Sequence, residues 1–315
     1  MSAIVRSPRT KVLLALFIVL SLLVLTACGG GGGTAGAKGT VTVGGKLDVE
    51  AQLLTEMYTL LLQKGGYAVN EKLALGDSIV VFQAITSGAI DLYPEFTATG
   101  LNKLGIPSSY DPQKDYETVK NGYKQQYKIT WLDMAPLNDG YAICTSKAQS
   151  QKLGITTISQ LAPKVSQLVL ASPSDGVSFI DGLKPVYGFD TTGFKSLQKV
   201  DYSIAFASVS NESAQMNVCY TTDGSVVTQN FIFLQDDKNG FPQFHPAPIV
   251  RDDVLSKYPD IASILNPLAP KLTTEVSIQL QQQVSKLKAG GTSVTEAVKQ
   301  TAKQFLQSQG LLPAS

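Results

Sequence analysis

Apolar residues switch between strand-like and helix-like spacing through the first hundred residues. Residues 40–45 (TVTVGG) alternate as a β-strand does, and residues 67–75 and 89–96 predict two further strands. Between these strands, the apolar residues from Leu53 to Leu61 recur at helical spacing, and residues 78–88 predict a shorter helix. A β-α-β-α-β order of this kind predicts a mostly parallel sheet that is covered by helices.

A second series of strands follows the polar stretch 108–126. Residues 129–146 (ITWLDMAPLNDGYAICTS) predict two strands separated by a turn. Residues 168–176 (LVLASPSDG) and 216–224 (MNVCYTTDG) each predict a strand that ends in a polar loop. Because ligands of open α/β sheets bind at the carboxyl ends of the strands, these loops are candidates for a binding site. Residues 276–305 predict two amphipathic helices with a Gly-Gly pair between them.

The N-terminal residues have the pattern of an export signal. Arg6, Arg9 and Lys11 precede the apolar stretch 12–25. As a helix, this stretch would be about 21 Å long, which is shorter than the roughly 30 Å hydrocarbon core of a bilayer. We therefore expect a signal peptide over residues 1–27 rather than a permanent membrane-spanning helix.

Cys28 follows directly after this stretch. The sequence LTAC resembles the lipobox at which bacterial lipoproteins are cleaved. We therefore expect lipidation of Cys28 and a flexible Gly-rich tether over residues 28–39. The protein would then be extracytoplasmic and anchored to the cell membrane, on the outer face of the plasma membrane or in the periplasm. An ordinary signal peptide with a Cys at its boundary is the alternative.

Composition restricts the class of protein. Hydrophobic residues make up 43% of the 315 residues, which is enough for a packed core. The chain has 26 Lys and Arg residues and 25 Asp and Glu residues, and three of the basic residues lie in the expected signal peptide. The exported part therefore has a small net negative charge and no run of basic residues, which argues against a nucleic-acid partner.

The cysteines and the single histidine leave little room for a metal site. Cys144 and Cys219 lie in apolar, strand-like sequences, so they are a possible disulfide in an oxidising compartment or two buried free thiols. One histidine, His245, and no Cys-x-x-Cys motif argue against a zinc site. We expect no metal and no cofactor.

Aromatic residues are concentrated beside turn sequences. They occur in residues 92–100 (LYPEFTATG), 138–145 (NDGYAICT), 218–224 (VCYTTDG) and 239–248 (NGFPQFHPAP). A single aromatic residue is more often part of a core than of a site, and we assign Trp131 to the core. Several aromatic residues at strand ends, however, predict a box of ring faces. Such a box suits a quaternary ammonium, because cation–π attraction needs no N–H donor.

These sequences resemble the substrate-binding lipoproteins of glycine betaine/carnitine/choline ABC importers. The resemblance extends over nearly all of residues 40–270, and its most specific parts are the D-L-Y-P-E-F-T-x-T and Y-T-T-D-G blocks. It implies a type II periplasmic-binding-protein-like fold. Each of two lobes would be a mixed, mostly parallel sheet flanked by helices, with a hinge of two crossover strands. It also implies a monomer that delivers its ligand to a permease with an ATPase. The segments concerned are 46–69, 75–101, 129–143, 219–224, 233–255 and 257–269.

The resemblance also implies ligand-binding residues. Four aromatic positions of the family's cage and two polar positions match this chain: Phe96, Tyr141, Tyr220 and Phe244, with Lys46 and Thr99 near the polar end of the ligand. The chain departs from the family pattern elsewhere. Phe96 and Phe244 stand where Tyr is frequent, Pro173 stands where some members have Arg, and Ala51 replaces a Gln. These departures leave the preferred quaternary amine open.

The expected lobes divide the chain unequally. Lobe 1 would combine residues 40–138 with 246–315, and lobe 2 would be the insert 139–245. Two other functions remain possible: a binding protein for another small cationic or zwitterionic solute, and a lipid-anchored adhesion or structural protein. An enzyme is not expected, because the two S-x-x-K sequences lack companion motifs and His245 has no evident nucleophile partner. We interpret Asp223 and Gly224 as turn residues.

Overall fold

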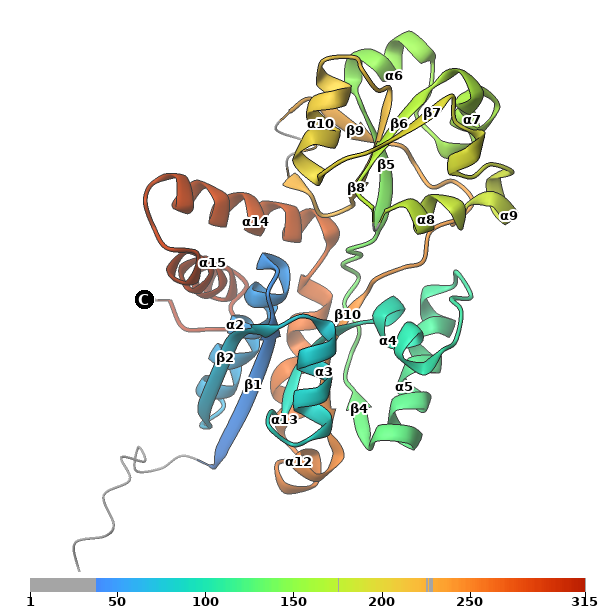
Figure 1. Cartoon of the computed structure of the whole chain (residues 1–315). Helices are drawn as coiled ribbons and strands as arrows, with labels where there is room; N and C mark the ends of the chain where they lie inside the picture. The colour runs from blue at the N-terminus through green and yellow to red at the C-terminus, as the bar shows by residue number, and fades with distance from the viewer. Residues whose placement is uncertain (1–37, 175, 225, 227–228, 315) are drawn as a thin grey trace, which may run out of the picture. The chain divides into compact units, whose positions relative to one another are not determined.

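The computed structural model describes residues 38–174, 176–224, 226 and 229–314. Within these residues, ten strands form two separate five-stranded sheets, each with helices packed against it (Figure 1). The expected signal peptide, Cys28 and the tether up to residue 37 lie outside the described residues. No helix in the described part of the chain has the length and apolar character needed to cross a bilayer.

The first sheet has the strand order β2-β1-β3-β10-β4. Strand β1 pairs in parallel with β2 and β3, whereas β10 runs antiparallel between β3 and β4. The strands are β1 (Thr40–Lys46), β2 (Ala68–Gly76), β3 (Leu92–Phe96), β4 (Ile129–Trp131) and β10 (Pro246–Arg251). Their helices are α2 (Val49–Lys64), α3 (Ser78–Thr86), α4 (Thr97–Leu104), α5 (Pro112–Tyr127), α12 (Asp252–Lys257), α13 (Ile261–Leu265), η3 (Asn266–Lys271), α14 (Thr274–Ala289) and α15 (Val294–Ser308).

Alternation along the strands divides the core of this sheet between its two faces. Leu92 and Val250 belong to the apolar cluster under α2, whereas Tyr93 and Ile249 belong to the cluster under α3 and α5. Helix α2 is buried on almost every side, and Asp48 caps its first turn by accepting a hydrogen bond from a backbone N–H at 2.7 Å. The β1-α2-β2-α3-β3 order confirms the prediction from residues 40–96.

The second sheet has the strand order β7-β6-β8-β5-β9. Strand β6 is parallel to β7 and β8, and β5 is antiparallel to β8 and β9. The strands are β5 (Tyr141–Ser146), β6 (Val169–Ser172), β7 (Ser196–Lys199), β8 (Met216–Tyr220) and β9 (Phe231–Phe233). Their helices are α6 (Lys147–Leu153), α7 (Ile158–Leu161), η1 (Ala162–Gln167), α8 (Val177–Asp181), α9 (Lys184–Tyr187), η2 (Thr191–Gly193) and α10 (Tyr202–Ser210).

A disulfide joins β5 to β8 through Cys144 and Cys219. Both sulfur-bearing residues are fully buried, in an apolar cluster that also contains Phe206 and Phe231. The register pairs Ala142 with Cys219, next to the pair Tyr141 and Tyr220 that begins β5 and ends β8.

Two segments, residues 132–140 and 234–245, connect the two sheets (Figure 1). They are bonded to each other: Asn138 Nδ2 donates to Gln243 Oε1 at 2.7 Å, and the Phe244 N–H donates to Asn138 Oδ1 at 2.8 Å. A backbone bond of 3.0 Å from Asp139 to Phe244 adds a third link. We call this pair the crossing segments. They lie where a hinge of two crossover strands is expected, but neither segment is assigned as a strand.

Candidate functional site

Aromatic rings gather where the crossing segments meet the second sheet. Tyr141 begins β5 and Tyr220 ends β8, and the register places them opposite each other with ring centroids 5.0 Å apart. Phe179 of α8 stacks on Tyr141 at 3.8 Å, and Phe244 lies 6.2 Å from Tyr141. Tyr202, at the start of α10, lies 5.3 Å from Tyr220. We call these five residues the aromatic array.

The rings of the array are packed against one another. A stacking distance of 3.8 Å between Tyr141 and Phe179 is already van der Waals contact. A ligand would therefore meet the outward faces of the array, unless the rings separate on binding.

Two cavities lie against the outward faces. A cavity of about 330 Å³ is lined by Phe179, Phe244 and Thr99. A second cavity, of about 510 Å³, is lined by Tyr202 and Tyr220. Both volumes fall within the range of roughly 300–1,000 Å³ that is usual for small-molecule sites.

The larger cavity is rich in carboxylates, and we call it the acidic cavity. Asp48 and Glu50 at the start of α2, Asp139 of the first crossing segment and Asp223 after β8 all line it. The Asp223 carboxylate accepts a hydrogen bond from the Tyr202 hydroxyl, so this residue positions a ring in addition to forming the expected turn. The remaining lining residues are Val49, Thr222 and Gln281.

Glu50 has one satisfied and one unsatisfied carboxylate oxygen. Its Oε2 accepts hydrogen bonds from the Ser277 hydroxyl and from Gln281 Nε2, the latter at 3.1 Å. Its Oε1 is buried and accepts no hydrogen bond from any residue that the structure describes. The nearby Thr222 hydroxyl has a single proton, which it donates to Asp139 Oδ1 at 2.6 Å.

Burial also raises the pKa values of Glu50 and Asp139. Desolvation, followed by the charge of Asp139, holds the pKa of Glu50 well above its usual range. Desolvation is also the main reason why the pKa of Asp139 rises to about 7, with the charge of Asp48 adding to it. At neutral pH Asp139 is therefore near the midpoint of its titration and can exchange a proton with a ligand in the cavity.

Lys46 is paired within the first sheet. Its Nζ lies 2.5 Å from Glu95 Oε1, both side chains are buried, and Tyr93 donates its hydroxyl to Glu95 Oε2 at 2.7 Å. The same Nζ lies 4.9 Å from the ring centroid of Phe96, which is only 5% exposed. The structure therefore places Lys46 and Phe96 together, beside the aromatic array but not in it.

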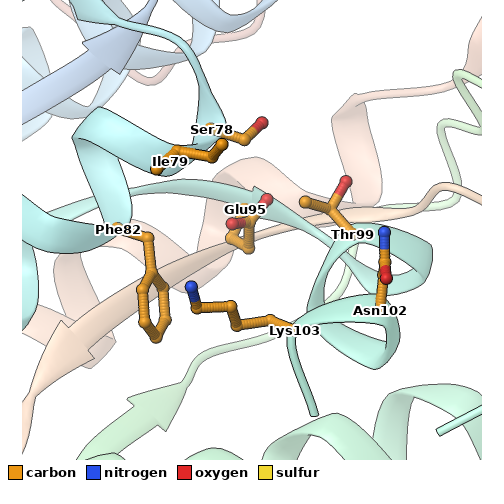
Figure 2. A pocket seen from close by; sticks show the side chains of 7 residues that line it. All are labelled: Ser78, Ile79, Phe82, Glu95, Thr99, Asn102 and Lys103. Atoms are coloured by element: carbon orange, nitrogen blue, oxygen red, sulfur yellow. The ribbon is translucent and has the colours of Figure 1, made fainter. Parts of the chain in front are cut away.

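Thr99 lies between two hollows on helix α4. Besides lining the 330 Å³ cavity, it lines a smaller one of about 170 Å³ with Glu95, Asn102 and Lys103. Figure 2 shows this smaller pocket, in which the Lys103 ammonium group lies 4.2 Å from the Phe82 ring centroid. Its volume is below the usual range for ligand sites, so we assign Thr99 to the larger cavity.

Other residues singled out in the sequence have structural roles. Trp131 is buried and packs edge-on against Tyr123, in agreement with its assignment to the core. His245 Nδ1 contacts the Leu137 carbonyl oxygen at 2.8 Å, which ties one crossing segment to the other. No group of three His, Cys, Asp or Glu side chains in the described part of the chain is arranged to hold a metal ion.

Sequence reasoning missed four residues that line the site. Phe179 and Tyr202 are single aromatic residues at the starts of short helices, so neither belonged to an aromatic cluster in the sequence. Asp139 lies in a sequence that predicts a turn, and Glu50 directly precedes Ala51, which stands where the family has a Gln. For Asp139 and Glu50, the usable signals are an acidic residue two positions before a predicted cage aromatic and an acidic residue at the start of the first helix.

Two α/β sheets joined by two crossing segments, with rings and cavities at the junction, define a two-lobed solute-binding protein. Residues 39–308 match the family model described as the substrate-binding domain of the ABC-type glycine betaine transport system. The chain belongs to this family. Its members are extracytoplasmic solute-binding proteins of ABC transporters and not enzymes, as predicted.

Individual relatives agree with this assignment. The chain is 26% identical to the carnitine transport binding protein OpuCC of Listeria monocytogenes, over 94% of this chain and 96% of that protein. It is 29% identical to the glycine betaine-binding protein YehZ of Escherichia coli, over 79% and 86%. The apo structure of YehZ superposes with a TM-score of 0.71 at 27% identity, over 87% and 99% of the two chains, which confirms the type II fold.

A further relative is longer than this chain. The ergothioneine transport permease/ergothioneine binding protein EgtU of Helicobacter pylori is 28% identical over 86% of this chain. The match extends over 48% of the length of that protein, so the chain spans about half of it.

Proposed function

We propose that the protein captures a quaternary ammonium solute at the aromatic array and delivers it to an ABC importer. The observation that carries this proposal is the convergence of Tyr141, Tyr220 and Phe244, from three separate segments, at the junction of the two sheets. Three of the four predicted cage residues are thus neighbours, and Phe179 adds a fourth ring. A methylated ammonium is held by such faces with about 0.5–2 kcal/mol per ring.

The names of the relatives support the same class of ligand. Glycine betaine, carnitine and ergothioneine all contain a trimethylammonium group, although they differ in the rest of the molecule. Thr99, at the edge of the 330 Å³ cavity, remains our candidate for a hydrogen bond to the polar end of the ligand. Phe96 and Lys46 contribute in our proposal only if the Lys46–Glu95 pair opens on binding.

We further propose the organisation expected from the sequence. Lobe 1 comprises residues 40–138 and 246–315, lobe 2 comprises residues 139–245, and the crossing segments act as a hinge. A lipid on Cys28 and the Gly-rich tether hold the monomer near its permease. Small-angle scattering with and without saturating ligand tests the hinge, and unchanged dimensions would contradict closure.

Calorimetry with the full chain in detergent tests the proposed ligand class. Tyr141→Leu and Tyr220→Leu keep apolar bulk but remove a ring face, and each should weaken binding of choline or glycine betaine about 2- to 30-fold. The neutral carbon isostere of choline should bind far more weakly than choline. Tyr258→Leu, a ring substitution at a distant site packed on Tyr67, is the matched control. Equal affinity for choline and its neutral isostere would reject the cage.

A second candidate function is the binding of a different small cation. The acidic cavity favours this alternative over an uncharged solute, and a primary diamine in the same calorimetric series would reveal it. Tight binding of the diamine with no binding of methylated ammonium compounds would replace the proposal.

A further inference from the structure

Carboxyl groups in the acidic cavity can distinguish ligands that ring faces alone cannot distinguish. We propose that it selects quaternary ammonium ligands that have a net positive charge and no carboxylate, and that Glu50 and Asp139 are the specificity-determining residues. This inference rests on the proposed function, because it concerns the same ligand class.

The first argument is the sign of the charges around the cavity. Four carboxylates line it, and no Lys or Arg is among its described lining residues. The cation that acts on Asp139 is Lys46, whose ammonium group is already paired with Glu95 at 2.5 Å. A ligand carboxylate in this cavity would meet acidic groups and would have no cationic partner. A net cation would favour the ionised form of these acids and would be attracted to it.

The second argument is the unsatisfied oxygen of Glu50. Glu50 is 4% exposed, lines the cavity and has a buried Oε1 without a hydrogen-bond partner among the described residues. A buried carboxylate oxygen without a partner is costly, so such groups usually face a ligand, a water molecule or an ion. The neighbouring donors are already used, since Ser277 and Gln281 donate to Oε2 and Thr222 donates to Asp139. A hydroxyl or a cation of the ligand would satisfy this oxygen.

The third argument is the position of the rings. Tyr202 and Tyr220 line the same cavity as Glu50 and Asp139, so one ligand can meet ring faces and carboxylates together. Rings alone do not distinguish choline from glycine betaine, because both have a trimethylammonium group. The carboxylates do distinguish them, because only glycine betaine has a negative group of its own.

A competing interpretation makes the opposite prediction. Glu50 could remain protonated in the complex and donate a hydrogen bond to a ligand carboxylate, which would favour glycine betaine. The two interpretations differ in the protons exchanged. A bound cation should expel a proton from the pair formed by Glu50 and Asp139, whereas binding of a carboxylate should be accompanied by proton uptake.

The test is calorimetry of choline and glycine betaine with the full chain in detergent at pH near 7. Measurements in two buffers of different ionisation enthalpy give the number of protons exchanged. We expect choline to bind at least about tenfold more tightly than glycine betaine and to release protons. Glu50→Gln and Asp139→Asn keep the shape of the side chain and remove its ability to ionise. Each should lower the ratio of choline affinity to glycine betaine affinity by about fivefold or more. Glu117→Gln, an exposed charge on α5, is the control and should change nothing.

The outcomes separate this inference from the proposed function. Methylated ammonium compounds that bind with ring-dependent affinity, but with glycine betaine equal to or tighter than choline, would overturn the inference and leave the proposed function intact. Binding of neither compound would overturn both. If Glu50→Gln does not give a cooperative unfolding transition, Asp139→Asn gives the same test at a less buried position.

Discussion

Removing the Cys144–Cys219 disulfide should destabilise the second sheet without removing its ligand-facing rings. The perturbation is the double variant Cys144→Ala/Cys219→Ala. The cross-link joins residues 75 positions apart, so it restricts the unfolded chain strongly. For a loop of that length, the chain-entropy relation gives about 4.5 kcal/mol at 25 °C, and native disulfides usually contribute about 2–5 kcal/mol.

Thermal and urea unfolding measure this effect. A loss of about 2–4 kcal/mol should lower Tm by roughly 3–7 °C for a chain of this size. A phosphine reductant should lower the Tm of the unsubstituted protein by a similar amount and should leave the double variant unchanged. Choline affinity at 25 °C should fall by less than about threefold, because the β5–β8 ladder still pairs Tyr141 with Tyr220.

Two results would refute this reasoning. If the double variant unfolds at the same temperature as the parent, the loop closed by the disulfide is already restricted in the unfolded chain. If stability is unchanged but ligand binding is lost, the cross-link positions the rings rather than stabilising the sheet.

Three other changes have expected outcomes. Lys46→Met leaves Glu95 buried without its ion-pair partner and should lower the free energy of unfolding in urea by about 3–5 kcal/mol. Adding Glu95→Leu should recover most of that loss. Unchanged stability in Lys46→Met would contradict the buried pair. The pKa of Asp139 is about 7, above the roughly 3.9 of an unfolded Asp, so its stabilising contribution is present at low pH and is lost as pH rises through 7. Tm should therefore fall between about pH 4 and 7, and Asp139→Asn should flatten this fall. An identical pH profile would reject the raised pKa. Cys28→Ser should release the protein from membranes or leave its precursor unprocessed. Fractionation and mass spectrometry measure both effects. Normal processing and retention of the variant would exclude lipidation at Cys28.

Regular patterns explain which parts of the fold could be predicted. Strands and helices of residues 40–96 follow from apolar spacing, because each has one face in a core. Helix α5 was missed because only Tyr116, Val119 and Tyr123 form its apolar face, and the rest of its surface is polar. Strands β7 and β9, of four and three residues, are too short for alternation to be visible.

The site could be predicted only where its residues lie in recognisable sequence motifs. Tyr141 and Tyr220 are 79 positions apart in the sequence, and each begins or ends a recognisable strand motif, so their contact follows once the strands pair. The pairing of Lys46 with Glu95 could not be foreseen, because it depends on the relative positions of β1 and β3. The acidic cavity likewise needs Glu50 and Asp139 to be brought together from separate segments.

The strand order of the first sheet also restricts the sequence of events during synthesis. Strand β10 lies between β3 and β4, yet its residues 246–251 are made after every strand of the second sheet. A chain that emerges N-terminus first can therefore complete the second sheet and oxidise its cysteines while the first sheet still lacks a central strand. The sheet whose strands β1 to β4 are made first is thus the sheet that is completed last, and a chaperone would encounter it in an unfinished state.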